Sequence, residues 1–80
     1  MTRQEALRLL ETTLEMGPNT LTGDEHLRDL DGWDSLSALA FIAMADRERN
    51  LALPGGAVVR CRTVDELIDL LGVSGLERAA

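Results

Sequence analysis

A long apolar segment in the middle of the chain constrains its fold most strongly. The segment begins at Asp34-Ser35, directly after the turn-like run Asp31-Gly32-Trp33, and contains no charged residue between Asp34 and Asp46. At helical spacing it is apolar nearly all round rather than along one stripe. A chain of 80 residues forms only one core, so such a helix cannot bury every side. We therefore expect a single small domain whose middle helix leaves apolar surface exposed.

Capping boxes mark two further helices. Thr2-Arg3-Gln4-Glu5 begins the first, and leucines at helical spacing follow until Gly17-Pro18-Asn19, which we expect to end it. Thr63-Val64-Asp65-Glu66 begins the last helix, and Gly72 is expected to stop it. The apolar residues predicted to form its buried side are Val64, Leu67, Ile68, Leu70 and Leu71.

The connections between these helices differ in character. The long connection over residues 17–33 contains Leu21, Leu27, Leu30 and Trp33, which predicts that it is pinned across the bundle rather than freely solvated. Residues 55–61 are expected to form a short third helix. Its two adjacent glycines each lower helix stability by about 1 kcal/mol relative to alanine. We therefore predict a late start for this helix, or exchange between conformations.

No strand alternation, repeat or low-complexity segment competes with the helical pattern. The predicted fold class is all-α, a four-helix bundle with three longer helices, a short third helix and a long first loop. The prediction is one domain over residues 1–80, with an ordered core at about 2–72 and a loose tail at 73–80.

Composition restricts the function classes. A net charge of −6 disfavours nucleic acid as a partner. No signal-like run follows Met1 and no segment approaches the length of a membrane span, so a free-standing cytoplasmic protein without a membrane partner is expected. Cys61 is the only cysteine, which excludes an internal disulfide and favours a helix-packing thiol over a reactive one.

Ser35 is the strongest candidate functional residue. A hydroxyl at the start of a helix is exposed, and the first free N–H groups and the positive end of the helix dipole stabilise a phosphate attached to it. The site therefore suits a cofactor linked through a phosphodiester. The structural alternative is that Asp34 or Ser35 only caps the helix, because both residue types accept hydrogen bonds from the first N–H groups.

The order of motifs around this serine resembles the acyl carrier protein family. The matching runs are 27–36, which reads LRDLDGWDSL, the Leu-Pro break at 51–54 and Thr63 to Leu67 after the long helix. The resemblance implies the four-helix fold and 4′-phosphopantetheine attached to Ser35. Its thiol would hold acyl groups as thioesters, so the chain would be a discrete carrier rather than an enzyme, with no catalytic residue of its own.

The same resemblance implies partners. A phosphopantetheinyl transferase would load Ser35, with Asp34 assisting the transferase and its metal, and Leu36 anchoring the contact. Acyl-loading, condensing or acyltransferase enzymes of a fatty-acid-like or polyketide-like pathway would then act on a carrier that is a monomer. The residues predicted to bind partners are Asp34, Leu36, Ala40, Met44, Asp46 and Glu48.

The middle helix departs from the family pattern in its charges. Many carriers have acidic residues at the positions of Ser37 and Ala40, whereas acidic groups here first appear at Asp46 and Glu48, alternating with arginines. The usual acidic docking face is therefore not expected, and partner enzymes are expected to differ. Met44 is interpreted either as an adaptable partner contact or as core filling.

Enzymatic alternatives have little support in the sequence. His26 is the only histidine and is interpreted as a solvated loop residue. Asp24, Glu25, Asp29 and Asp31 form an acidic cluster without calcium-loop spacing, so we predict no permanent metal site. Two other functions remain open: a carrier of aminoacyl groups for nonribosomal peptide assembly, and a helical interaction module that is never modified.

Overall fold

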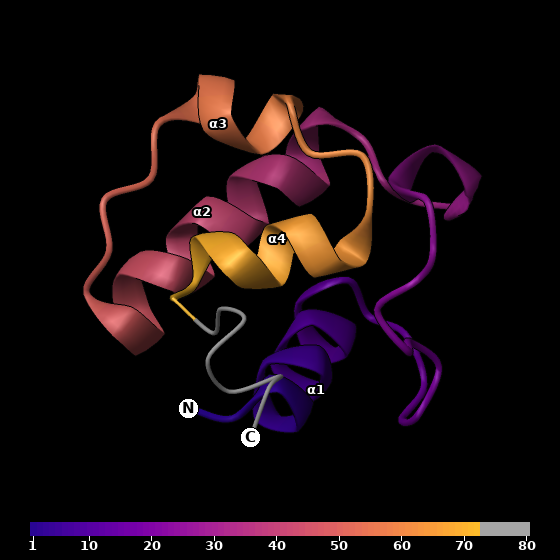
Figure 1. The fold of residues 1–80 in the computed structure, drawn as a ribbon. Coiled ribbons are helices and arrows are strands. Elements are labelled where there is room, and N and C mark those ends of the chain that lie inside the picture. The colour runs from indigo at the N-terminus through magenta and orange to yellow at the C-terminus, as the bar shows by residue number, and fades with distance from the viewer. Residues whose placement is uncertain (73–80) are drawn as a thin grey trace.

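Helix α2 (Ser35–Arg49) is the longest element and carries the centre of the core. The computed structural model describes residues 1–72, in which α1 (Arg3–Thr13), α3 (Gly55–Val59) and α4 (Val64–Leu70) pack around it, with a 3₁₀ turn η1 (Leu27–Asp29) in the long first connection. In the view of Figure 1, α4 is in front of α2, with α1 below them and α3 above. The all-α prediction is confirmed, and the predicted loose tail at 73–80 lies outside the described residues.

The core consists of one face from each helix and the leucines of the first loop. Helix α2 contributes Phe41, Met44 and Ala45, all buried, and packs against α1 and α3. Helix α4 packs against α1, and its Val64, Leu67 and Ile68 are fully buried. Such burial stabilises the fold by roughly 1.5–3 kcal/mol for each large aliphatic side chain. The predicted buried side of α4 is confirmed, with Leu70 only partly buried.

Helix α1 ends earlier than the sequence suggested. The expected stop was Gly17-Pro18-Asn19, but the helix ends at Thr13, and Glu15 takes the left-handed conformation with φ 58°. The N–H of Met16 donates to the carbonyl of Glu11 at 2.8 Å, and that of Glu15 donates to Thr12 at 3.1 Å. These two bonds form a Schellman motif without glycine, which satisfies the terminal carbonyls before Gly17 is reached.

The first connection is held at both ends, as its leucines predicted. Leu21 and Leu27 are buried, and Leu30 and Trp33 pack on the core. Glu11, only 2% exposed, accepts hydrogen bonds from the N–H groups of Leu21 at 2.8 Å and Asn19 at 3.2 Å. It also pairs with Arg8 at 2.9 Å, so its buried charge is compensated.

The far end of this connection runs beside the start of α4. His26 and Thr63 form an isolated antiparallel bridge, and Leu27 donates its N–H to the carbonyl of Arg62 at 2.8 Å. Val64 in turn donates to the carbonyl of Glu25 at 3.0 Å. This backbone pairing places η1 next to the segment that joins α3 to α4.

Helix α3 begins at Gly55, directly after Pro54. The prediction of a late start caused by Gly55-Gly56 is therefore wrong. Burial of Val58, 1% exposed, and packing of α3 on α2 outweigh the low helix propensity of the two glycines.

Candidate attachment site at the start of helix α2

Ser35 is the first residue of α2 and is exposed. The chain reaches it through Asp34, which is extended at φ −146° and acts as the N-cap. One residue of helix therefore separates the cap from the exposed apolar surface that follows. This geometry places a primary hydroxyl at the positive end of a fifteen-residue helix.

Asp34 and Ser37 fix this helix start. The Oδ1 atom of Asp34 accepts from the Ser37 N–H at 2.9 Å and lies 3.1 Å from the Ser37 hydroxyl, which also hydrogen-bonds the Gly32 carbonyl. The hydrogen bonds from the backbone and then the side chain of Ser37 lower the pKa of Asp34 below its ordinary value. Asp34 is thus ionised near neutral pH, and the turn before Ser35 is tied to the helix.

The Ser35 hydroxyl itself forms no side-chain hydrogen bond within residues 1–72. Gly32, in the turn before it, has φ +88° and open space where a side chain would be. The site fits a phosphodiester-linked group, because the hydroxyl is accessible and the first N–H groups of the helix face an attached phosphate. The capping interpretation applies to Asp34, whereas Ser35 is the residue after the cap.

Exposed apolar side chains follow Ser35 along α2, and another lies at the end of α3. Leu36 is 73% exposed, Leu39 is 62% exposed, and Val59 at the end of α3 is 74% exposed. Ala40 is partly buried. The middle helix therefore leaves apolar surface in solvent, as its all-round apolarity predicted.

The acidic candidates lie at the other end of α2. Asp46 and Glu48 are exposed, and Glu48 accepts from Arg47 at 3.3 Å. Glu48 also lines a shallow pocket with Met1 and with residues of α1, including Glu5 and Leu9. Its carboxylate is therefore on the α1 side of the helix.

Met44 requires a correction. It was predicted to bind partners, but its side chain is 1% exposed and lies in the core. An all-round apolar helix does not indicate which of its faces is buried, and packing against the other helices turns Met44 inward. Core filling, the alternative interpretation, describes this residue.

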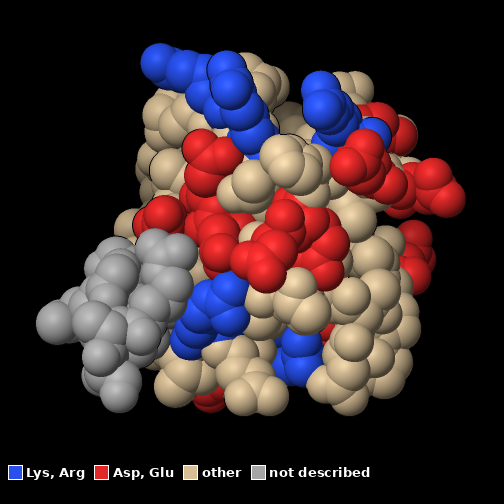
Figure 2. All heavy atoms as spheres, turned by 45° about the vertical axis from the view of Figure 1, so that its right-hand side comes forward, with Lys and Arg blue, Asp and Glu red and all other residues tan. Residues whose placement is uncertain are grey.

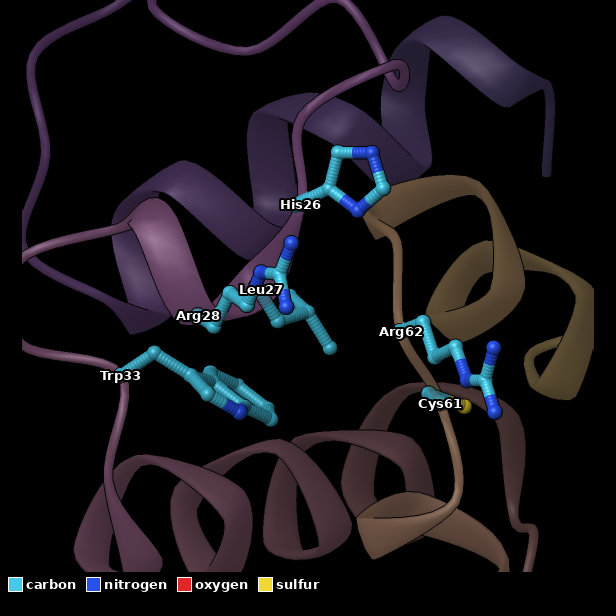
Figure 3. A pocket seen from close by; sticks show the side chains of 6 residues that line it. All are labelled: His26, Leu27, Arg28, Trp33, Cys61 and Arg62. Carbon is cyan, nitrogen blue, oxygen red and sulfur yellow. The ribbon is translucent and has the colours of Figure 1, made fainter.

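A pocket of about 370 Å³ lies between the first loop and the segment that follows α3 (Figure 3). It is lined by His26, Leu27, Arg28, Trp33, Cys61 and Arg62. The sequence did not indicate this pocket, because its lining residues come together only through the pairing of the first loop with the start of α4. The indole of Trp33 extends over this pocket from the chain just before α2.

The remaining chemical candidates have structural roles. Cys61 is partly buried after α3, and burial first, then Glu66 and Asp69, raise its thiol pKa, which disfavours the nucleophilic thiolate. Within the described residues no group of three acidic, His or Cys side chains is placed to hold a metal ion.

Glu25, from the acidic cluster, organises its own loop. Burial opposes ionisation of Glu25, but hydrogen bonds from the N–H groups of Thr22 and Gly23 outweigh it and lower the pKa of this carboxyl.

Across residues 1–72, no helix is long and apolar enough to cross a membrane.

Comparison with known proteins agrees with this geometry. The family model described as "Phosphopantetheine attachment site" matches residues 4–71, which include all four helices except the first residue of α1. Domains of this family carry covalently attached 4′-phosphopantetheine and act as non-catalytic carriers. Searches of curated proteins and of solved structures gave no match. The match over most of its length shows that the chain belongs to the phosphopantetheine attachment site family of carrier domains.

Proposed function

We propose that Ser35 is the residue to which 4′-phosphopantetheine is attached, and that the chain carries acyl intermediates for a fatty-acid-like or polyketide-like pathway. The observation that carries this proposal is the exposed, unengaged hydroxyl of Ser35 at the start of α2 in a domain of this family. The terminal thiol of the bound group would hold each acyl intermediate as a thioester.

The protein presents the tethered acyl intermediate to partner enzymes and does not itself react with it. The N–H groups at the start of α2 stabilise the negative charge of the phosphodiester, and the capped turn holds the attachment point rigid. A tethered intermediate meets successive enzymes at a high effective concentration instead of diffusing away. No side chain near Ser35 needs to act as an acid or base for this role.

Partner enzymes would contact the surface around Ser35. A phosphopantetheinyl transferase would meet Asp34 and the exposed Leu36, and acyl-loading, condensing or acyltransferase enzymes would use the same apolar surface, with Leu39 and Ala40. Asp46 and Glu48 would add peripheral charge contacts further along α2. The surface beside Ser35 would therefore attract partners mainly through apolar contacts.

Loading with coenzyme A and a broad-specificity phosphopantetheinyl transferase tests the proposal. Intact-protein mass of the wild type is expected to rise by one phosphopantetheine, and that of Ser35→Ala to stay unchanged. Ser37→Ala is the matched control, because its hydroxyl lies one helical turn from the cap but is engaged with Gly32 and Asp34. Failure of the wild type to gain mass with several transferases would favour an unmodified interaction module.

The charge of Asp34 can be separated from its capping role. Asparagine caps helices about as well as aspartate, so Asp34→Asn is expected to keep the thermal unfolding midpoint of the wild type. Loading of Ser35 is expected to slow at least tenfold, which corresponds to a loss of about 1.4 kcal/mol in transition-state stabilisation. The initial loading rate measured by mass spectrometry checks this. Equal rates in the two proteins would show that Asp34 acts only as a cap.

A further inference from the structure

The pocket beside Trp33 has a basic lining in an acidic chain. Of its six lining residues, Arg28 and Arg62 are cationic, whereas the whole chain has a net charge of −6. Figure 2 shows basic groups at the upper edge of one face of the molecule and again below its centre, with acidic groups between them. None of the six lining residues is acidic, so the formal charge of the lining itself is positive.

Neither pocket arginine forms an ion pair within the described residues. Across residues 1–72, the ion pairs are formed by Arg3, Arg8 and Arg47. The N–H groups of Arg62 and Thr63 donate to the carboxylate of Glu66 at 2.8 and 3.0 Å and lower its pKa, and the charge of Arg62 adds a smaller effect in the same direction. Both guanidinium groups therefore retain hydrogen-bond donors for an anion from outside the fold.

The rest of the pocket is suited to a small organic group. Trp33 and Leu27 provide apolar walls, and the volume of about 370 Å³ lies in the range of small-molecule sites. In Figure 3, Trp33 approaches from the chain before α2, while Cys61 and Arg62 lie on the segment facing it. The Arg28 and Arg62 side chains extend in different directions in this view, so an occupant beside Trp33 would meet them from different sides of the pocket.

The pocket is also within reach of the proposed attachment residue. Trp33 lies two residues before Ser35, and two residues of extended chain span at most about 7 Å. A group tethered to the Ser35 hydroxyl by a flexible arm is therefore close enough to reach the Trp33 side of this pocket.

We propose that this pocket binds the negatively charged end of a small acyl group tethered at Ser35, with Arg28 and Arg62 contacting its carboxylate and Trp33 and Leu27 contacting its carbon chain. The inference rests on the proposed function and adds to it a class of cargo: acyl groups that end in a carboxylate. Such groups would be favoured over neutral groups of equal length.

The alternative anions fit the pocket less well. The phosphodiester of the arm is bonded directly to the Ser35 hydroxyl and is held at the start of α2, whereas Arg62 lies on the opposite wall of the pocket from Trp33. An acidic side chain of a partner protein is presented on a flat or convex surface, whereas Trp33 and Leu27 border a hollow.

The test compares two cargoes that have the same number of carbon atoms. The transferase loads the full chain from succinyl-coenzyme A or from butyryl-coenzyme A, and intact mass first establishes that each acyl-phosphopantetheine is attached. The rate of thioester cleavage by hydroxylamine then reports how well the protein shelters the acyl group. Each rate is divided by that of the corresponding free coenzyme A thioester, because the succinyl carboxylate can attack its own thioester and release the thiol. We expect this ratio to be about fivefold lower for the succinyl form than for the butyryl form, the scale of a partly exposed charge pair.

Matched variants assign the effect to the pocket. Arg28→Gln and Arg62→Gln are each expected to reduce the succinyl protection to less than about twofold. Arg47→Gln removes the same charge from the exposed surface of α2 and is expected to leave the protection unchanged. The indole N–H resonance of Trp33 is expected to shift on loading with succinyl more than with butyryl.

The outcomes separate this inference from the proposed function. No mass gain with either donor contradicts the carrier function itself. A mass gain with equal cleavage-rate ratios for the two cargoes, or succinyl protection that survives both arginine substitutions, overturns the cargo inference and leaves the carrier function intact. A Trp33 shift that already appears with unacylated phosphopantetheine and disappears in Arg28→Gln would assign the arginines to the arm instead, and overturns it as well.

Discussion

Helices α2 and α4 both begin with a side-chain N-cap, but the surroundings of the two caps differ. Asp34 caps α2 and Thr63 caps α4, and each accepts from the N–H three residues later, at 2.9 and 3.3 Å. At α4 the first helical residue, Val64, is fully buried, whereas at α2 the first helical residue, Ser35, is exposed. The cap therefore defines a helix start, and the surroundings decide whether that start is a site.

Backbone hydrogen bonds explain the difference. At the start of α4, the N–H groups of Val64 and Asp65 donate to carbonyls of the first loop at 3.0 and 2.9 Å. Among residues 1–72, no carbonyl of another segment reaches the N–H groups of Ser35 and Leu36. One helix start is thus closed by the fold, while the other remains open to an attached phosphate.

Substitution of the first helical residue gives the largest contrast. Val64→Ala leaves a cavity in the core and is expected to lower the free energy of unfolding by about 2 kcal/mol. Ser35→Ala changes only exposed surface and is expected to alter it by no more than about 0.5 kcal/mol. Urea unfolding followed by circular dichroism measures both. Equal destabilisation would show that the two helix starts are similarly buried.

Removal of the α4 cap has a smaller effect. Thr63→Ala deletes the acceptor of the Glu66 N–H and is expected to lower the free energy of unfolding by about 1 kcal/mol, the usual value for an N-cap. Thr63→Ser retains the acceptor and serves as the control in the same unfolding experiment. Because this helix start is remote from Ser35 in the sequence, loading is expected to be unchanged. A loading defect in Thr63→Ala at a temperature where the protein is folded would contradict the separation of the two helix starts.

Acid is expected to weaken both helix starts slightly. Hydrogen bonds from the N–H groups of Arg62 and Thr63 lower the pKa of Glu66, and those from Ser37 lower the pKa of Asp34. A carboxylate whose pKa is lower in the folded than in the unfolded state stabilises the fold above the unfolded value. This contribution is lost as the pH falls through the pKa of the folded state. The free energy of unfolding should therefore decline below about pH 4.5. Glu66→Gln should flatten part of this decline in acid titrations of the unfolding midpoint, and an unchanged acid limb would contradict the role given to Glu66.

Local signals in the sequence predicted the helix starts well. The capping boxes at Thr2 and Thr63 and the cap at Asp34 are all present, because these patterns depend only on residues three positions apart. The start of α2, with its exposed serine, could therefore be located without a structure. Ser37, which ties this start to Gly32, was missed as a positioning residue, although a hydroxyl three residues after an N-cap aspartate was the available signal.

Features that depend on distant residues were not predictable in the same way. Glu11 looks like an ordinary surface glutamate in the sequence, yet it is buried because Leu21 and Asn19 of the first loop donate to it. The pocket arginines meet only because the first loop pairs with the start of α4. Met44 was misplaced for a related reason, since packing rather than pattern selects the inner face of α2.

The most direct test of the account is the position of the added group in the loaded wild-type protein. Proteolysis and fragmentation of the peptide containing Asp34-Ser35-Leu36-Ser37 distinguish two hydroxyls that are two residues apart, one open and one engaged by Gly32 and Asp34. The account predicts that phosphopantetheine is found on Ser35 alone. Its presence on Ser37, or on any serine outside α2, would contradict the assignment of the open helix start as the attachment site.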